Sequence, residues 1–343
     1  MRIGFLLPSQ FAVGNPGNGI LEQARNIALA MEQRGHEVVR LNPWEHYPKA
    51  NLDVLHFFLG GAQLYGIERG RKEASRPCLV FSPIIDSNYS NTLYRFAARC
   101  GEVHPRVFTI QGLLRQQALA SDVVVCRSRH ERQRIMEGLG IPASKVAVVL
   151  NGIDVQAVPS SFMADVKLNL NLPDKFVLHI SSYTQERKNA LRLVDAVDKL
   201  GIPLVIAGHS EPGAVYTKLS QKAQHSKNIR MLGFIDKQTR NALYALCHVF
   251  CLPSHHEGTG LAALEAGLLG AHLVITKNGG PPDYFGPHAV YVNPFELEDI
   301  SHALQQVWNQ PRHDALRDHI AKNLTWHRSA EKLEAVYSEH LAH

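Results

Sequence analysis

The sequence is poor in cysteine and in charge. Its 343 residues include only five cysteines, an odd number with no C-x-x-C pair, which argues against a disulfide framework or a zinc ribbon. Only 20% of the residues are charged and the formal net charge is +5, so a coiled coil, a solvating linker or an obvious nucleic-acid binder is disfavoured. Nineteen histidines form no H-E-x-x-H motif and no Cys/His cluster. We therefore expect a reducing cytoplasmic setting, no bound metal and no nucleic-acid partner.

Long apolar runs are also missing. The most apolar long segment, 260–275, contains Glu265 and His272 and falls short of the ~20 residues that span a bilayer. The opening run 1–7 is interrupted by Pro8 before it could form the core of a signal peptide, so no signal sequence is expected. The length fits two domains of about 100 to 200 residues, and 45% apolar residues suffice for two buried cores.

Short aliphatic runs alternate with longer stretches of helical spacing along the whole chain. This alternation predicts an α/β protein with two mostly parallel sheets, each covered by helices on both faces, and thus two Rossmann-like halves. The predicted strands of the first half are 2–7, 37–41, 54–58, 78–81, 123–126 and 146–150, and those of the second half are 176–181, 203–207, 229–232, 249–252, 272–276 and 289–292.

A polar stretch separates the two series. Residues 156–172 contain Pro159, two serines and the run Asn169-Leu170-Asn171, which is typical of a linker and not of a helix or strand. We therefore predict an N-terminal domain over 1–155, a C-terminal domain over 173–321 and a last helix over 322–343.

A glycine-rich turn precedes the first predicted helix. Gly14, Gly17 and Gly19 lie just before an apolar stripe that begins at Ile20 and ends at Gly35. The backbone amides at such a helix start suit a phosphate or a sugar hydroxyl. The spacing G-x-x-G-x-G differs from the dinucleotide fingerprint, which disfavours an NAD site. The same glycines would equally serve a tight strand-to-helix turn.

The segment 252–266, with the sequence LPSHHEGTGLAALEA, carries the strongest functional signal. It follows a predicted buried strand and opens a helix. Gly258 and Gly260 leave room for a ligand to approach the backbone, and the amides from Thr259 to Leu261 are directed at whatever precedes the helix. A diphosphate fits this description.

Two glutamates flank that turn and are expected to act separately. Glu257 stays in the loop, whereas Glu265 lies within the helix. The helical rise over 259–265 is about 9 Å, longer than the ~5.5 Å between the two acids of a retaining glycosidase, so a hydrolytic pair is disfavoured. The simpler interpretations are a capping acid for Glu257 and a solvated helix face for Glu265.

The pair Glu257 and Glu265, within P-S-x-x-E-G-x-G-L-x-x-L-E-A, resembles the E-x7-E signature of retaining GT-B glycosyltransferases of group 1. The resemblance extends over nearly the whole chain. It implies a GT-B fold of two Rossmann-like domains that face each other across a cleft, with the last helix crossing back to the first domain. The further motifs that carry it are Arg34-Gly35-His36-Glu37-Val38, Asn151-Gly152-Ile153-Asp154, Leu232-Gly233-Phe234, Asn278-Gly279-Gly280-Pro281 and Trp326.

Members of this family move a sugar from a nucleotide diphosphate to an acceptor hydroxyl with retention, usually without a metal. The resemblance therefore implies a hexosyltransferase that uses a UDP- or GDP-sugar as substrate, with no cofactor, in cell-surface glycan or oligosaccharide synthesis. A catalytically impaired sugar-nucleotide or glycan-binding module of the same fold is the alternative, because Ser82 and Ser182 replace a histidine and an arginine that relatives often have. A nucleotide-sugar epimerase on this architecture is a third possibility.

The family's roles transfer to particular residues. Lys188 matches the cation that binds the pyrophosphate. Either Arg187 compensates for Ser182, or the helix amides bind more of the phosphate. Asp86 is expected to offer a carboxylate near the acceptor, although an exposed turn aspartate would look the same. The expected catalytic residues are Glu257, Lys188 and Asp86, and the expected donor-binding residues are Gly17, Gly19, Arg187, Lys188, Gly233, Phe234, Gly258, Thr259, Gly260, Leu261 and Glu265.

Basic residues are concentrated in the first predicted domain. Residues 68–134 contain 12 Lys and Arg against 6 Asp and Glu. This excess suits a glycan or lipid-linked acceptor and a peripheral contact of the N-terminal domain with an anionic membrane. Solvated helix faces would give the same count.

Overall fold

The computed structural model divides the chain into two compact units. It describes residues 1–8, 19–42, 45, 51–60, 77–87, 89–103 and 109–341. Unit 1 comprises Met1–Gly152 and Thr325–His343, and unit 2 comprises Ile153–Leu324. The divisions thus fall after Gly152 and after Leu324, and the C-terminal segment belongs to the same unit as the N-terminal one.

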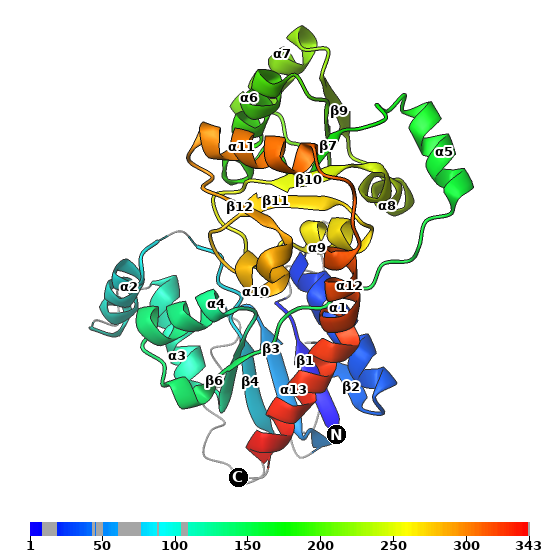
Figure 1. Ribbon diagram of the computed structural model, residues 1–343. Coiled ribbons are helices and arrows are strands. Elements are labelled where there is room, and N and C mark those ends of the chain that lie inside the picture. Colours follow the sequence, from blue (N-terminus) through cyan, green and yellow to red (C-terminus); the bar gives the residue numbers. More distant parts are fainter. Residues whose placement is uncertain are drawn as a thin grey trace. The chain divides into compact units, whose positions relative to one another are not determined.

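Unit 1 is built on a six-stranded parallel sheet (Figure 1) with the order β2-β1-β3-β4-β5-β6. The central strands are buried on both faces, which explains their continuous runs of apolar residues. The strands are β1 (Arg2–Leu6), β2 (Glu37–Arg40), β3 (Val54–Phe58), β4 (Cys78–Ser82), β5 (Val123–Cys126) and β6 (Val146–Val148).

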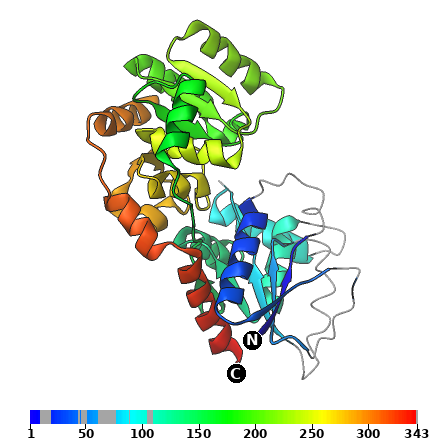
Figure 2. The ribbon, with the colours of Figure 1, turned by 90° about the vertical axis from the view of Figure 1, so that its right-hand side faces the viewer.

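Two helices from opposite ends of the chain share the core of unit 1. Helix α1 (Gly19–Gln33) buries Ile27 and Met31 on its inner stripe, and helix α13 (Trp326–Leu341) packs beside it with Leu333 and Tyr337 in the same core. Figures 1 and 2 show α13 along this unit. The other helical segments of unit 1 are α2 (Asn91–Val103), α3 (Ile110–Ala120), α4 (Arg129–Gln133), the π-helical turn η5 (Arg134–Gly138) and the 3-10 turn η6 (Ala143–Lys145).

Unit 2 repeats the design with a second parallel sheet, in the order β12-β11-β10-β7-β8-β9. Its strands are β7 (Val177–Ile180), β8 (Leu204–Ala207), β9 (Ile229–Gly233), β10 (Val249–Leu252), β11 (His272–Thr276) and β12 (Val290–Val292). All twelve predicted strands are present, and the prediction of an α/β protein with two parallel sheets is confirmed.

Helices cover the sheet of unit 2. They are α6 (Ala190–Leu200), α7 (Ala214–His225), α8 (Lys237–Leu246), α9 (Leu261–Leu268), α10 (Pro281–Phe285), α11 (Leu297–Trp308) and α12 (Ala315–Asn323), with the 3-10 turns η7 (Glu186–Lys188) and η8 (Gly286–His288). Among the described residues of both units, no helix combines the length and apolarity needed to cross a bilayer.

The predicted linker over 156–172 is wrong in one respect, because it contains a helix. Helix α5 (Ser160–Asn169) begins after Pro159 and packs against α8. Only Val166 of this helix is buried, so it lacks the apolar stripe by which a helix is recognised in a sequence. The proline and the serines that indicated a linker stand instead at the start of the helix, where proline is tolerated.

Candidate active site

An ion pair between Lys188 and Glu257 lies at the ends of two neighbouring strands of unit 2. Lys188 ends η7, which follows β7, and Glu257 lies in the loop after β10. Lys188 Nζ donates a hydrogen bond to Glu257 Oε1 over 2.6 Å. The two side chains are only 12% and 10% exposed, so solvent screens this charge pair much less than a surface pair. The structure thus brings together two of the three residues predicted to be catalytic.

The loops that carry the pair are tied together by hydrogen bonds. Asn189 has a positive φ of 59° and donates its side-chain amide to the carbonyl oxygens of Pro253 (2.9 Å) and Pro294 (2.7 Å). The amide of His255 donates to the carbonyl of Arg187 over 2.8 Å. These bonds hold the loop of Lys188 against the loop of Glu257, so the pair is preorganised by the backbone.

A third loop fixes the backbone of Glu257 from the other side. Its amide donates to the carbonyl of Asn278 (3.1 Å), its carbonyl accepts from the amide of Gly280 (2.9 Å), and it forms an isolated parallel β-bridge with Gly279. Gly279 has a φ of +107°, and a Cβ at this position would stand 2.0 Å from the carbonyl oxygen of Glu257. Glycine is therefore required here, which gives the N-G-G-P motif a structural role.

Substitution of Gly279 is expected to disturb Glu257. Gly279→Ala should lower the free energy of unfolding of unit 2 by at least about 2 kcal/mol, because alanine is strained at this φ and clashes with the Glu257 carbonyl. Urea unfolding would measure the loss. Gly213→Ala is the matched control, since a Cβ added at Gly213 would meet no other heavy atom within 4 Å. Equal stability of the two variants would contradict the prediction.

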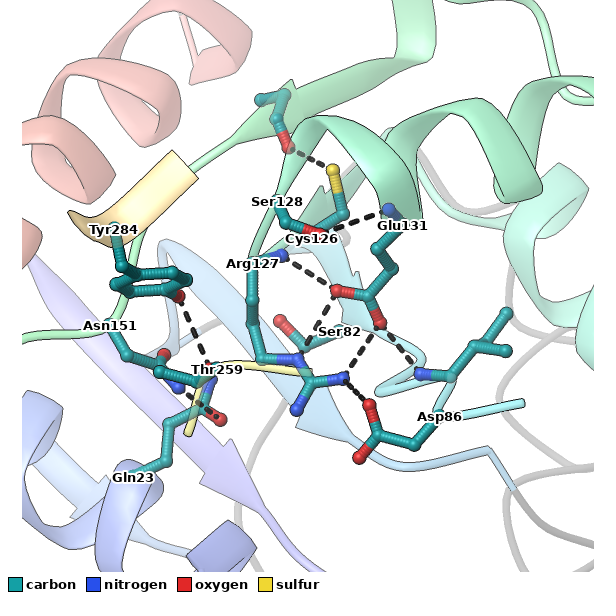
Figure 3. A network of polar contacts seen from close by, with 12 residues as sticks. Gln23, Ser82, Asp86, Cys126, Arg127, Ser128, Glu131, Asn151, Thr259 and Tyr284 are labelled. Carbon is teal, nitrogen blue, oxygen red and sulfur yellow. Dashed lines mark hydrogen bonds and ion pairs between the residues drawn. The ribbon is translucent and has the colours of Figure 1, made fainter. Parts of the chain in front are cut away.

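The residues after Glu257 form the N-terminus of α9. Gly260 caps the helix with a φ of +79°, and its carbonyl accepts the amides of Ala263 and Leu264. The first amides of a helix have no acceptor within the helix and carry a partial positive charge. Thr259 is buried, and its hydroxyl donates to Tyr284 Oη over 3.3 Å, as drawn in Figure 3. The predicted turn from Gly258 to Leu261 thus forms the N-terminal end of α9.

Glu265 has a different partner from Glu257. Glu265 Oε1 accepts a hydrogen bond from Arg240 Nη2 of α8 over 3.1 Å. Tyr244, one turn further along α8, is fully buried, and both this burial and the Glu265 carboxylate raise its pKa well above the usual range. Glu265 therefore lies beside the guanidinium of Arg240 and the phenol of Tyr244. Neither Arg240 nor Tyr244 was singled out in the sequence.

A buried histidine behind the ion pair was also not predicted from the sequence. His179 lies within β7, with Nδ1 facing the carbonyl of Cys251 at 2.8 Å and Nε2 facing the hydroxyl of Ser181 at 2.8 Å. Since a carbonyl only accepts, Nδ1 carries the proton and Ser181 donates to Nε2. Burial lowers the pKa of His179 to about 4, so the ring is neutral. The sequence did contain one indication of this residue, because His179 is the polar residue of an otherwise apolar strand.

Other predicted donor residues lie apart from the ion pair. The side chain of Arg187 is exposed and donates through Nε to Gln185. Gly233 ends β9 with a φ of +69°, and the next residue, Phe234, is 81% exposed. In unit 1, Gly19 is the first residue of α1, whereas Gly17 lies outside the described residues.

Asp86, the third predicted catalytic residue, belongs to unit 1 and is held by an arginine (Figure 3). Arg127 Nη2 donates to Asp86 Oδ1 over 2.9 Å. Arg127 follows β5, and its own backbone amide and Nε donate to Glu131 at 2.7 and 3.2 Å. Glu131 is buried and also accepts the amide of Ile85 at 2.6 Å. One carboxylate thus connects the loop of Asp86 to the start of α4.

Ser82, where relatives often have histidine, contacts a histidine from the neighbouring strand. His56 of β3 places Nε2 at 2.8 Å from Ser82 Oγ and Nδ1 at 2.6 Å from the hydroxyl of Tyr337 in α13. Burial lowers the pKa of His56 to about 3. The neutral ring therefore joins two strands of the sheet to the C-terminal helix. Within the described residues of either unit, no group of three or more His, Cys, Asp or Glu side chains could hold a metal ion.

Solved structures identify the fold. Sucrose-phosphate synthase from Thermosynechococcus elongatus is similar with a TM-score of 0.75 and 16% identity, over 99% of either chain. Anabaena HepE in complex with UDP gives a TM-score of 0.72 and 18% identity, over 99% of this chain and 100% of the other. The predicted GT-B fold is confirmed.

A family model matches part of the chain. Residues 163–325 match the family model of Glycosyl transferases group 1. This segment covers most of unit 2 and includes Lys188, Glu257 and Glu265, and the match confirms that this part of the chain resembles group 1 glycosyltransferases.

Curated relatives align with part of the chain. The serotype-specific mannosyltransferase WbdA of Escherichia coli is 26% identical over 54% of this chain and 24% of its own length. The O-antigen chain mannosyltransferase B of Escherichia coli is 25% identical over 61% of this chain and 58% of its own length. The alignments thus span about a quarter of the first relative and less than two thirds of the second.

Proposed function

We propose that the protein is a retaining, metal-independent glycosyltransferase that moves a hexose from a nucleotide diphosphate to an acceptor hydroxyl. The observation that carries this proposal is the buried pair of Lys188 and Glu257 directly before the N-terminus of α9, inside the group 1 domain. This arrangement offers a cation and backbone amides for a diphosphate, with a carboxylate beside them for the attached sugar.

The roles of the unit 2 residues follow from these contacts. Lys188 and the amides from Gly258 to Leu261 would hold the diphosphate and stabilise the negative charge that develops on the leaving phosphate. Glu257 would position the donor sugar and favour positive charge at the anomeric carbon. Glu265 would accept the ribose hydroxyls. In the free protein Glu257 neutralises Lys188, so the arriving diphosphate competes with a carboxylate for the same ammonium group.

The chemical step needs no covalent enzyme intermediate. The bond between the anomeric carbon and the phosphate oxygen breaks, and the acceptor oxygen forms the new bond on the same face of the sugar. The acceptor's proton passes to the leaving phosphate oxygen. In unit 1, Asp86 held by Arg127 would orient the acceptor hydroxyl. Because Glu131 holds Arg127 in place, the pair of Asp86 and Arg127 loses little entropy when it binds the acceptor.

The relatives favour particular donors for the first test. Both curated relatives named above are mannosyltransferases, which makes a GDP-linked mannose the first candidate. HepE was solved with UDP, which makes a UDP-linked sugar the second. Glycan assembly is the setting that the O-antigen relative suggests.

A thermal-shift screen of GDP, UDP and their sugars tests the proposal. A ligand that binds only the folded protein at a hundred times its Kd stabilises it by about 2.7 kcal/mol, so the donor should raise Tm by several degrees. The donor found in this way is then incubated with candidate glycan and lipid-linked acceptors, and nucleotide diphosphate release is followed. Release that requires an acceptor and disappears in Glu257→Ala supports a transferase.

The same assay separates the alternatives. A binding module of this fold would show a thermal shift but no release of nucleotide diphosphate with any acceptor. This alternative is worth testing because Ser82, which contacts His56, replaces a histidine that relatives often have. An epimerase would convert the donor sugar with no acceptor present. Absence of any shift with GDP, UDP or their sugars would overturn the proposal.

A further inference from the structure

Three buried polar side chains of unit 1 form a chain of hydrogen bonds that the proposed transfer does not use. His56 of β3 lies between Ser82 of β4 and Tyr337 of α13, and its ring nitrogens are 2.8 and 2.6 Å from their hydroxyl oxygens. Ser82, His56 and Tyr337 are 2%, 1% and 0% exposed. A buried polar group is costly unless it has a hydrogen-bond partner. The direction of these two hydrogen bonds is therefore constrained.

Neighbouring aromatic rings hold the His56 ring in place. It stacks on Phe58 with ring centroids 4.2 Å apart, and it meets Phe5 and Tyr337 edge to face at 5.5 and 5.9 Å. Burial lowers the pKa of His56 to about 3, so the ring is neutral and carries a single N–H proton. One ring nitrogen therefore donates a hydrogen bond and the other accepts one.

The phenol of Tyr337 decides which nitrogen donates. Among the described residues, its hydroxyl has Nδ1 of His56 as its only hydrogen-bond partner. If Nδ1 carried the proton, Tyr337 would accept it, and the phenol's own proton would stay unpaired in the core. If Nε2 carries the proton, Tyr337 donates to Nδ1 and Nε2 donates to Ser82 Oγ. The second arrangement satisfies the deeper group, and it is the reverse of that in His179.

This direction leaves Ser82 with a hydroxyl proton that His56 does not accept. In the part of the chain that the structure describes, Ser82 Oγ has no partner besides His56. Ser82 ends β4 at the carboxyl edge of the parallel sheet, the edge at which α/β proteins bind ligands. Ile84, two residues later, has a φ of 56°, which is rare for a β-branched residue and is found mostly at functional sites. A donor without an acceptor thus precedes a strained loop.

We propose that His56 and Tyr337 are positioning residues that leave the hydroxyl proton of Ser82 free to bind an oxygen atom of a substrate sugar. The inference rests on the proposed function, which supplies sugars with hydroxyl and ring oxygens as acceptors. The loop after Ser82 leads to Asp86, whose side chain is 47% exposed, and Figure 3 draws both residues. A substrate that contacts Asp86 therefore reaches the edge of the sheet at which Ser82 lies. Either the donor hexose or the acceptor glycan supplies the oxygen.

Nitrogen NMR of the full chain with isotope-labelled histidine tests the direction of the two hydrogen bonds. At neutral pH, His56 should have a protonated Nε2 and an unprotonated Nδ1. Its resonances are assigned by their loss in His56→Gln. A protonated Nδ1 would overturn the inference, because Ser82 would then donate its proton to Nε2.

Substrate affinity tests the role of the free proton. Ser82→Ala should weaken binding of the nucleotide sugar but not of the nucleotide diphosphate, or raise the KM for the acceptor, by about three- to tenfold. Calorimetry measures the first effect, which indicates the donor hexose, and acceptor-dependent release measures the second. Tyr337→Phe should show part of the same loss, since the ring is then free to accept from Ser82. Added to Ser82→Ala, it should cause no further loss.

Tyr291→Phe is the matched control for loss of a phenol. Tyr291 of β12 in unit 2 donates to the carbonyl of Gly286 over 2.8 Å, and this variant should keep the affinities of the unaltered protein. Unchanged affinities for donor and acceptor in Ser82→Ala would overturn the inference. So would additive losses in the double variant, which indicate that Tyr337 acts on structure alone. A protein that gave no thermal shift with any nucleotide or nucleotide sugar would refute the proposed function, while the NMR measurement would still decide the direction of the bonds.

Discussion

Replacement of Lys188 by methionine should reduce donor turnover by at least about 10² to 10³-fold, the effect of removing one preorganised charge donor from a leaving group. Methionine keeps much of the side-chain volume but removes the ammonium group that contacts Glu257 over 2.6 Å. Affinity for the nucleotide diphosphate should fall as well, because the cation binds it in the ground state. Acceptor-dependent release and calorimetric binding of the diphosphate would measure the two effects.

Two further variants separate a functional role from a structural one. Lys188→Met alone leaves a buried carboxylate without its cation, which costs about 3 to 5 kcal/mol of stability. The double variant Lys188→Met with Glu257→Gln removes that charge, so it should recover stability but not turnover. Lys199→Ala is the surface control, because Lys199 pairs with Glu298 in solvent. Turnover of Lys188→Met or of the double variant at the level of the unaltered protein would exclude the proposed role of Lys188.

Acidification below pH 6.5 should destabilise the protein steeply. Burial lowers the pKa of His56 to about 3 and that of His179 to about 4, and burial together with neighbouring His248 and His313 lowers the pKa of His272 to about 4. An unfolded chain has the ordinary value of 6.5. Between pH 6.5 and about 4 the unfolded state therefore binds more protons than the folded state, and stability falls as pH falls.

The size of this effect follows from the number of histidines. Each proton taken up on unfolding contributes about 1.4 kcal/mol per pH unit, so three give a limiting slope of about 4 kcal/mol per pH unit. Urea unfolding from pH 7 to 4.5 would measure the slope. His272→Gln should reduce the slope by about one proton. A slope near zero over this range would contradict the prediction.

The strands were predictable because burial on both faces requires a continuous run of apolar residues in the sequence. Every residue of β5, Val-Val-Val-Cys, is buried, and such a run reads as a strand whatever surrounds it. Helix α5 has no comparable apolar pattern, since Val166 is its only buried residue. The error over 156–172 thus comes from a helix that packs against α8 without an apolar stripe.

The sequence pointed to Lys188 and Glu257 but not to the contact between them. Lys188 and Glu257 were each chosen from motifs, yet their ion pair depends on the pairing of β7 with β10, two strands far apart in the chain. The contact of Arg240 with Glu265 depends in the same way on the packing of α8 against α9. His179 was missed because the sequence shows only a polar residue within a predicted strand. Its hydrogen-bond partners, the carbonyl of Cys251 and the hydroxyl of Ser181, are known only from the structure.

The sharing of one core by α1 and α13 has a consequence for biosynthesis. A ribosome releases Met1–Gly152 well before Trp326–Leu341, with all of unit 2 made in between. Until α13 emerges, His56 lacks the hydroxyl of Tyr337, and the apolar positions that Leu333 covers remain open to water. The segment Met1–Gly152 must therefore wait, incompletely folded, for α13, while unit 2 between them can fold as soon as it is made.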